Sequence, residues 1–138
     1  PCASSCFAVA NLPAETVITS GHLDGALRFW CTKSEEKVHE MKDVHGDAIT
    51  SVTMTLDGNY VLTNSRDHTL KLVDVRKYQE VAMFENDMYI NGDNTNRACL
   101  NSSGKYGAVG SRQGNVIIFE LKSDSINLEE IYTDYHSA

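Results

Sequence analysis

The sequence predicts an all-β fold assembled from about three repeated units of four strands each. Apolar and polar residues alternate over 49–56, the pair Asp57-Gly58 follows, and a second apolar run occupies 60–62. Alternation with a period of two indicates half-buried strands, and glycine after aspartate is typical of the turn in a β-hairpin. The pattern also recurs, because Asp24 and Asp67 occupy matching motifs 43 residues apart. Repeats of roughly this length are typical of β-propeller blades.

The expected elements follow this repeat along the chain. A second mark, the hairpin glycine, recurs at an offset of 46 residues, at Gly58 and Gly104. In chain order we expect strands at 6–10, 16–19, 26–30, 37–41, 49–56, 60–62, 69–74, 80–84, 97–100, 106–109, 115–119 and 128–132. The corresponding blades span about 1–44, 45–90 and 91–135, and a further blade begins at 136–138. Since propellers close with about four to eight blades, the chain is expected to be a fragment of a larger propeller.

Charge and composition exclude several classes of function. The chain carries 12 lysine and arginine residues against 19 acidic residues, for a formal net charge of −7, and this balance argues against a nucleic-acid-binding surface. No apolar run is long enough to span a bilayer and no signal peptide is present, so an intracellular protein without membrane insertion is expected. The four cysteines lack CxxC spacing, and neither a metal site nor a cofactor is expected.

Three segments carry a resemblance to a known family. They read SGHLDGALRFW at 20–30, SRDHTLKLVDVR at 65–76 and GSRQGNVIIF at 110–119. In this order they resemble successive C-terminal blades of the WD40-repeat propeller of autophagy-related protein 16, and the similarity covers nearly the whole chain. The resemblance implies a propeller of about seven blades at the end of a longer protein, of which this chain would be a WD40 β-propeller fragment of about three blades.

A set of polar residues matches the structural hydrogen-bond network of WD40 blades. His45 precedes the first strand of the second blade, Thr63 follows its second apolar run and Asp67 lies in the next turn. The resemblance implies that these three side chains bind one another. In the first blade the matching residues are Ser20, Asp24 and Trp30. A threonine, a histidine and an aspartate could also form a catalytic triad, but the structural interpretation is favoured because buried polar groups need partners, and no enzyme activity is expected.

The turns and loops beside this network are expected to form the binding surface, because loops on a rigid scaffold usually carry recognition. The residues placed on this rim are His22, Leu23, Asp47, Arg66 and Arg112. Leu23 is an apolar residue in a turn, which indicates either a partner contact or packing on a neighbouring loop. Arg66 and Arg112 hold equivalent places and could form a positive pair. The resemblance implies that Leu23 and Asp47 are positions at which partners bind.

The resemblance implies a non-catalytic protein–protein interaction scaffold of the autophagy machinery. The expected protein is a subunit similar to autophagy-related protein 16, which recruits the ubiquitin-like lipid-conjugation complex to membranes for autophagosome formation. Its implied partners are that conjugation complex, bound through regions outside this chain, and membrane proteins or their regulators on the rim. Dimerisation would use a coiled coil outside this chain. The implied location is the cytoplasm, peripheral to autophagosome precursor membranes, with no nucleic-acid partner.

A second interpretation is a WD40 substrate receptor of a cullin-type ubiquitin ligase. The segment 73–76, VDVR, approximates the WDxR element that docks some propellers on the ligase adaptor. Valine stands where that element has tryptophan, and Arg76 could instead pair with Asp74 or Glu80. Binding of the adaptor that depends on Arg76 would distinguish this interpretation from the autophagy scaffold.

Overall fold

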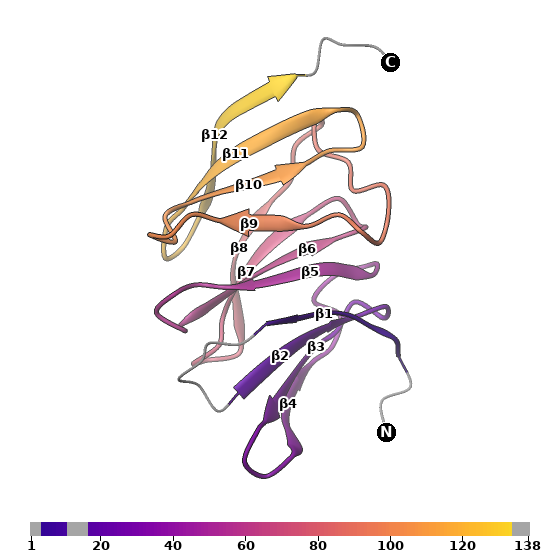
Figure 1. Ribbon diagram of the computed structural model, residues 1–138, viewed down its shortest axis with the longest axis vertical. Coiled ribbons are helices and arrows are strands. Elements are labelled where there is room, and N and C mark those ends of the chain that lie inside the picture. Colours follow the sequence, from indigo (N-terminus) through magenta and orange to yellow (C-terminus); the bar gives the residue numbers. More distant parts are fainter. Residues whose placement is uncertain (1–3, 11–16, 134–138) are drawn as a thin grey trace.

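The computed structural model describes residues 4–10 and 17–133, and these form three four-stranded antiparallel sheets. In each sheet the spatial order of the strands follows the chain, so consecutive strands are hydrogen-bonded neighbours. Figure 1 shows the three sheets stacked along the long axis, with the first sheet at one end and the third at the other. The predicted all-β fold of four-stranded repeats is therefore confirmed.

The twelve strands of the described residues are divided among the three sheets in chain order. The first contains β1 (Cys6–Ala10), β2 (Val17–His22), β3 (Leu27–Cys31) and β4 (Glu36–Met41). The second contains β5 (Ile49–Met54), β6 (Tyr60–Ser65), β7 (Leu70–Asp74) and β8 (Gln79–Phe84), and the third contains β9 (Ala98–Leu100), β10 (Tyr106–Gly110), β11 (Asn115–Leu121) and β12 (Ile126–Thr133). The first strands follow one another along the stack, with β5 in contact with both β1 and β9. The expected beginning of a further blade at 136–138 lies outside the described residues.

Strand β6 is longer than its apolar run predicts. The run ends at Leu62, but the strand continues to Ser65 because its polar residues are paired on both sides. Thr63 lies opposite Val52 of β5 and Lys71 of β7 in the antiparallel register. Polar residues stay buried in a strand only where their hydrogen-bonding groups are satisfied. This end of β6 therefore contributes to the candidate site.

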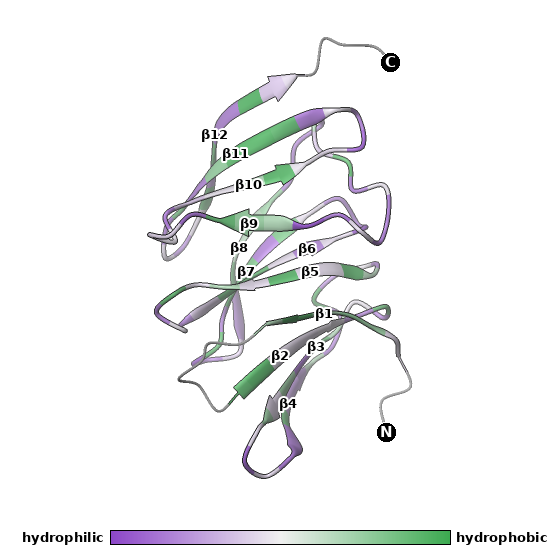
Figure 2. Cartoon of the chain, in the orientation of Figure 1, coloured by the Kyte–Doolittle hydropathy of each residue, from purple (hydrophilic) through white to green (hydrophobic). Residues whose placement is uncertain are grey.

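Apolar side chains fill the two spaces between adjacent sheets. The core between the first and second sheets includes Leu27, Phe29, Val44, Ile49, Val52, Val61 and Val73. The core between the second and third includes Leu62, Leu70, Leu72, Phe84, Val109, Ile117 and Phe119. Successive residues of β6 divide between these cores, since side chains of a strand alternate between its faces. Figure 2 shows hydrophobic residues concentrated in the strands, while the β3–β4 turn and the β8–β9 loop are largely hydrophilic.

The predicted hairpin turns close in the same way in the second and third blades. The Gly58 amide donates to the Thr55 carbonyl and the Gly104 amide donates to the Asn101 carbonyl, at 2.9 Å in both. Both glycines lie in the left-handed region of the backbone, with φ of 75° and 70°. A residue with a side chain would be strained there. The repeat therefore relates two turns of the same geometry.

Candidate functional site

The candidate site is the rim formed by the β2–β3, β6–β7 and β10–β11 turns with the loops 42–48 and 85–97, called the turn rim below. Near the start of each of the three turns, a backbone amide donates to a carbonyl ahead of the first strand of its own sheet. The pairs are Leu23 to Ser5, Arg66 to Ala48 and Arg112 to Ile90, at 2.8–2.9 Å. The three turns therefore lie at one end of the strands.

Neighbouring blades interlock on the turn rim. The His45 amide donates to the Gly25 carbonyl at 3.1 Å, which brings the β2–β3 turn against the loop that leads into the second blade. Gly25 has φ of 78°, and a Cβ atom there would overlap the His45 carbonyl oxygen, so this approach requires glycine. At the next junction the Asn91 amide donates to His68 Nδ1 at 3.1 Å. The β2–β3 and β6–β7 turns are thus each held by the blade that follows them.

The second blade holds a connected set of polar side chains at the turn rim. His45 Nδ1 lies 3.0 Å from Asp67 Oδ2, and His45 Nε2 lies 2.7 Å from Thr63 Oγ1. Asp67 Oδ1 accepts from the amide and the hydroxyl of Thr69 at 3.0 and 2.6 Å, and Oδ2 accepts from the Gly46 amide at 3.0 Å. The structure thus brings His45, Thr63 and Asp67 together and adds Thr69, which the sequence pattern had not singled out.

This network orients the imidazole and leaves Thr63 out of reach of a substrate. A carboxylate only accepts hydrogen bonds, so the contact with Asp67 places a proton on His45 Nδ1. Burial acts to raise the pKa of Asp67, but hydrogen bonds from His45 and Thr69 outweigh it and hold that pKa below its ordinary value of 3.8. Thr63 and His45 are 0 % and 3 % exposed, so a carbonyl substrate has no approach to this hydroxyl. The hydrogen bonds of Asp67 with His45 and Gly46 can hold the β6–β7 turn against the loop 42–48.

The first blade has a different set of contacts from the one predicted. Trp30 Nε1 donates to Ser20 Oγ at 2.8 Å, so these two predicted residues meet. His22 was expected on the exposed rim, but it is 2 % exposed and its Nε2 lies 2.8 Å from Ser20 Oγ. That placement was wrong because β2 extends through His22 and turns its side chain inward. In this blade His22 occupies the imidazole position beside the buried serine.

Asp24, predicted to join Ser20 and Trp30, pairs instead with Arg28. The carboxylate Oδ2 accepts from Arg28 Nη2 at 2.7 Å, and Arg28 Nε donates to Glu40 at 2.9 Å. The guanidinium holds the pKa of Asp24 at about 2, below its ordinary value of 3.8. Arg28 is 8 % exposed, and the two carboxylates compensate its buried charge. The pair ties the β2–β3 turn to strands β3 and β4.

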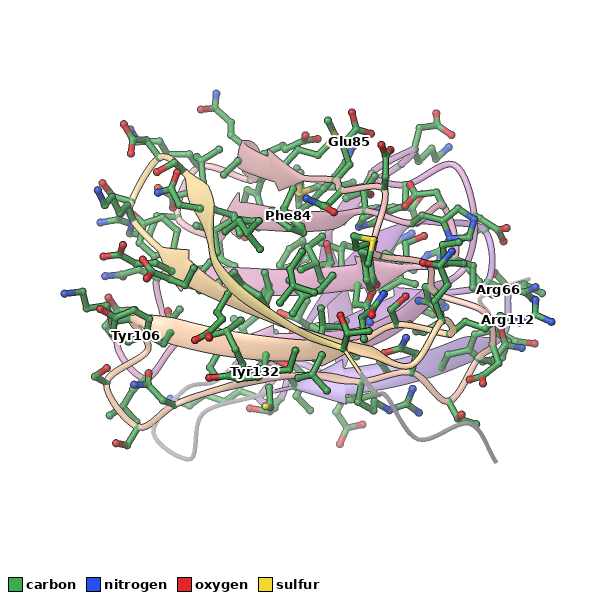
Figure 3. All side chains as sticks on the ribbon, turned by 90° about the horizontal axis from the view of Figure 1, so that it is seen from above. Arg66, Phe84, Glu85, Tyr106, Arg112 and Tyr132 are labelled. Atoms are coloured by element: carbon green, nitrogen blue, oxygen red, sulfur yellow. The ribbon has the colours of Figure 1, made fainter. Side chains whose placement is uncertain are left out.

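The remaining predicted rim residues, all exposed, are Leu23, Asp47, Arg66 and Arg112. The aliphatic part of Arg112 packs on Gly92, where a Cβ atom would overlap it. Arg66 Nη1 donates to Asn94 Oδ1 at 3.4 Å. Figure 3 shows Arg66 and Arg112 at the same edge of the molecule. Both arginines therefore border the loop 85–97, while Leu23 lies on the equivalent turn of the first blade.

A polar seam between the second and third blades was not anticipated from the sequence. Tyr89 and Asn91 belong to the polar loop 85–97, yet both are 1 % exposed. The Tyr89 hydroxyl donates to Asn64 Oδ1, and Asn91 Nδ2 donates to Thr50 Oγ1 at 2.8 Å. The sequence contains one signal of this burial, which is Tyr89 within a segment rich in Asn and Asp. An aromatic ring favours a buried position. These four side chains, called the polar seam below, join β5 and β6 to the loop that precedes β9.

Arg76, the residue that would dock on a ligase adaptor, is held within its own blade. Its guanidinium donates to the Asp74 carboxylate at 3.0 and 3.2 Å and to the Tyr60 hydroxyl at 3.2 Å. The side chain is 54 % exposed. Because Arg76 follows β7, it lies at the end of the strands opposite the turn rim.

The described residues contain neither a cluster of metal-ligating side chains nor a helix that could cross a membrane. Within 4–10 and 17–133 there is no group of three or more His, Cys, Asp or Glu side chains that could hold a metal ion. The cysteines in these ranges, Cys6, Cys31 and Cys99, are free thiols. Across the same part of the chain, no helix has the length and apolarity to cross a membrane.

Comparison with known proteins identifies the repeat. A family model described as "WD domain, G-beta repeat" matches residues 36–74, which include His45, Thr63 and Asp67. The crystal structure of RRP9 WD40 repeats matches 98 % of this chain and 40 % of that chain with a TM-score of 0.83 at 14 % identity, which shows the shared fold. The chain belongs to the WD40-repeat family. The interlocked turns and buried imidazoles are thus features of a WD40-repeat protein.

Two curated relatives are similar to this chain over most of its length. Protein tipD of Dictyostelium discoideum is 37 % identical over 121 residues, which is 86 % of this chain and 20 % of that protein. Autophagic-related protein 16.2 of Caenorhabditis elegans is 30 % identical over 113 residues, which is 82 % of this chain and 21 % of that protein. The chain therefore spans about a fifth of the length of these relatives.

Proposed function

We propose that this WD40-repeat chain belongs to a non-catalytic protein-interaction scaffold of the autophagy machinery, similar to autophagy-related protein 16. The observation that carries the proposal is the similarity to autophagic-related protein 16.2 of Caenorhabditis elegans, which extends over 82 % of this chain. The buried, fully engaged polar network of the second blade supports a scaffold, since such a network fixes loops without exposing a nucleophile. In this role the protein recruits the ubiquitin-like lipid-conjugation complex to autophagosome precursor membranes in the cytoplasm.

The turn rim is the surface proposed to bind partners. Its backbone is held by hydrogen bonds between turns and loops, so the backbone of these turns loses little conformational freedom on binding. Leu23 presents an apolar contact, and the turn that carries it is hydrogen-bonded to the loop that carries Asp47. Arg66 and Arg112 add positive charge to a chain whose formal net charge is −7. A partner segment that combines apolar and acidic side chains would be complementary to this surface.

Two apolar residues of equal exposure provide a matched test. Leu23 on the turn rim and Val38 on the outer strand β4 are both 48 % exposed. In the protein that carries this chain, we expect Leu23→Ser to reduce affinity-purified membrane-protein partners by about ten-fold, which corresponds to the loss of roughly half a leucine's burial. Val38→Ser should leave recovery unchanged. Equal recovery with both variants would contradict a binding role of the turn rim.

Arg76→Ala separates this proposal from the ubiquitin-ligase receptor. Arg76 lies at the other end of the strands, so its loss should leave recovery of autophagy conjugation proteins unchanged. The measurement is affinity purification of wild type and variant with quantification of co-purified proteins. If a cullin-ligase adaptor co-purifies with the wild type and is lost with Arg76→Ala, the receptor interpretation replaces the autophagy scaffold.

A further inference from the structure

The five arginines of the chain fall into two groups according to their partners. Arg28 and Arg76 form ion pairs with carboxylates, at 2.7 and 3.0 Å. Arg66, Arg97 and Arg112 form no ion pair with any described residue, although the chain has 19 acidic residues against 12 lysine and arginine residues. All three lie in the β6–β7 turn, the β10–β11 turn or the loop between β8 and β9, which are parts of the turn rim. The turn rim therefore carries guanidinium groups that no carboxylate of the described residues neutralises.

Contacts with the loop that precedes β9 bring these three arginines around one short segment. Arg66 Nη1 donates to the Asn94 side chain at 3.4 Å, and Arg97 Nη1 donates to the Asn94 carbonyl at 3.0 Å. The aliphatic part of Arg112 packs on Gly92, only two residues from Asn94. Figure 3 shows the Arg66 and Arg112 side chains at the same edge of the molecule. Three positive charges are therefore gathered beside this loop.

The repeat presents Arg66 and Arg112 in the same way from adjacent blades. They are 46 residues apart, and their amides donate to the Ala48 and Ile90 carbonyls at 2.9 and 2.8 Å. Both side chains are exposed. Nε and Nη2 of Arg66 and the whole guanidinium of Arg112 have no hydrogen-bond partner among the described residues. These N–H groups are therefore available to a ligand that approaches from solvent.

Two carboxylates near these arginines serve their own loops instead. Asp93 Oδ1 accepts from the Thr95 amide and hydroxyl at 2.7 and 2.6 Å, and Asp47 Oδ1 accepts from the Ala48 amide at 2.7 Å. The available donors favour a phosphate monoester over a carboxylate. A carboxylate has two oxygens and one negative charge, whereas a phosphate monoester has three acceptor oxygens and nearly two charges. Two guanidinium forks offer more N–H groups than one carboxylate can accept, and a phosphate can accept from both.

We propose that Arg66 and Arg112 bind the phosphate group of a phosphorylated serine or threonine in a partner protein. This inference rests on the proposed function, because it names the chemistry of a partner that the turn rim recruits. A protein segment fits better than a lipid surface for two reasons. The chain has a formal net charge of −7, so an anionic membrane repels it as a whole. Leu23 holds the equivalent place in the first blade, so a segment that follows the rim can add an apolar contact there.

Three peptides that differ in one side chain test the proposal. Their sequence is acetyl-Gly-Gly-X-Gly-Gly-amide, in which X is phosphoserine, glutamate or serine. In NMR titrations of the full chain, the phosphoserine peptide should shift the Nε–Hε resonances of Arg66 and Arg112, and the serine peptide should not. The glutamate peptide should bind about ten-fold more weakly than the phosphoserine peptide, because it accepts fewer charge-assisted hydrogen bonds.

The same substitution at three arginines locates the site. Arg66→Lys and Arg112→Lys keep the positive charge but remove the planar fork, so each should lower the affinity for the phosphoserine peptide by about ten-fold. Arg76→Lys, at an exposed site at the other end of the strands, is the matched control and should leave that affinity unchanged.

The wild-type titration needs no variant, and lack of phosphoserine-peptide binding to the folded chain would overturn the proposal. Equal affinities of wild type, Arg66→Lys and Arg112→Lys would also overturn it. Vesicles of phosphatidylcholine and phosphatidic acid test a lipid source of the phosphate, and binding to these vesicles without binding to the peptide would replace the protein partner by a membrane. The Leu23→Ser purification reports on the proposed function separately. If that variant loses partners while the phosphoserine peptide fails to bind, only the phosphate inference is wrong.

Discussion

Replacement of Asp67 by alanine tests the network that holds the turn rim. The carboxylate accepts four hydrogen bonds, from the His45 ring, the Gly46 amide, and the amide and hydroxyl of Thr69. After its removal, water can serve the exposed Gly46, and the Thr69 hydroxyl, 3.0 Å from His45 Nδ1, can accept from the ring. The amide of the buried Thr69 is left without an acceptor. One such group corresponds to about 1–3 kcal/mol, which is the expected loss in the free energy of unfolding.

Urea unfolding of the chain, followed by circular dichroism, measures this loss. The midpoint should fall while the dependence of the free energy on urea stays unchanged, as expected for a change in stability alone. Asp124→Ala, at an exposed turn site between β11 and β12, is the control and should stay within about 0.5 kcal/mol of wild type. If Asp67→Ala also stays within that margin, pairing of the buried groups does not stabilise the blade and the reasoning is refuted.

Two further outcomes concern the Asp24–Arg28 pair and the glycines of β10. Arg28 lowers the pKa of Asp24 from 3.8 to about 2, so the pair stabilises the folded state above about pH 3.8 and this stabilisation is lost as the pH falls through about 2. The difference in free energy of unfolding between wild type and Asp24→Asn should therefore narrow as the pH falls from about 3.8 to about 2. A difference that stays constant over this pH range would contradict a stabilising role of the ion pair. In the urea assay Gly107→Ala should destabilise by about 1–3 kcal/mol, because a Cβ atom would overlap the Phe119 ring and lie 2.7 Å from the Cys99 carbonyl oxygen. Gly110→Ala, with no described atom within 4 Å of its Cβ, should be nearly neutral, and equal losses would rule out the steric explanation.

The strands and their grouping could be predicted because their signals are local and repeated. Alternating residues and hairpin glycines lie next to one another in the chain, and the second blade shows both between 49 and 62. The proximity of His45, Thr63 and Asp67 was anticipated through the resemblance to WD40 blades, in which one sheet and its leading loop carry the matching residues. Within a blade the prediction was incomplete, because Asp24 pairs with Arg28 and not with Ser20 and Trp30.

Contacts that depend on a second segment could not be predicted in this way. His22 is buried because β2 continues past its apolar residues and Ser4 and Ser20 lie beside the ring. Tyr89 and Asn91 are buried because the second blade offers polar groups to the loop that precedes β9. The segments that carry these residues are as polar as a surface turn. Whether the residues are buried depends on the neighbouring segment that packs against them.

The two junctions differ in how they resist displacement. Between the second and third blades, the polar seam adds directional bonds to the apolar core, and such bonds weaken steeply when the donor angle changes. Between the first and second blades, the backbone bond from the His45 amide to the Gly25 carbonyl accompanies apolar packing, which is non-directional. Sliding of the third blade against the second would have to break buried side-chain hydrogen bonds as well as apolar contacts.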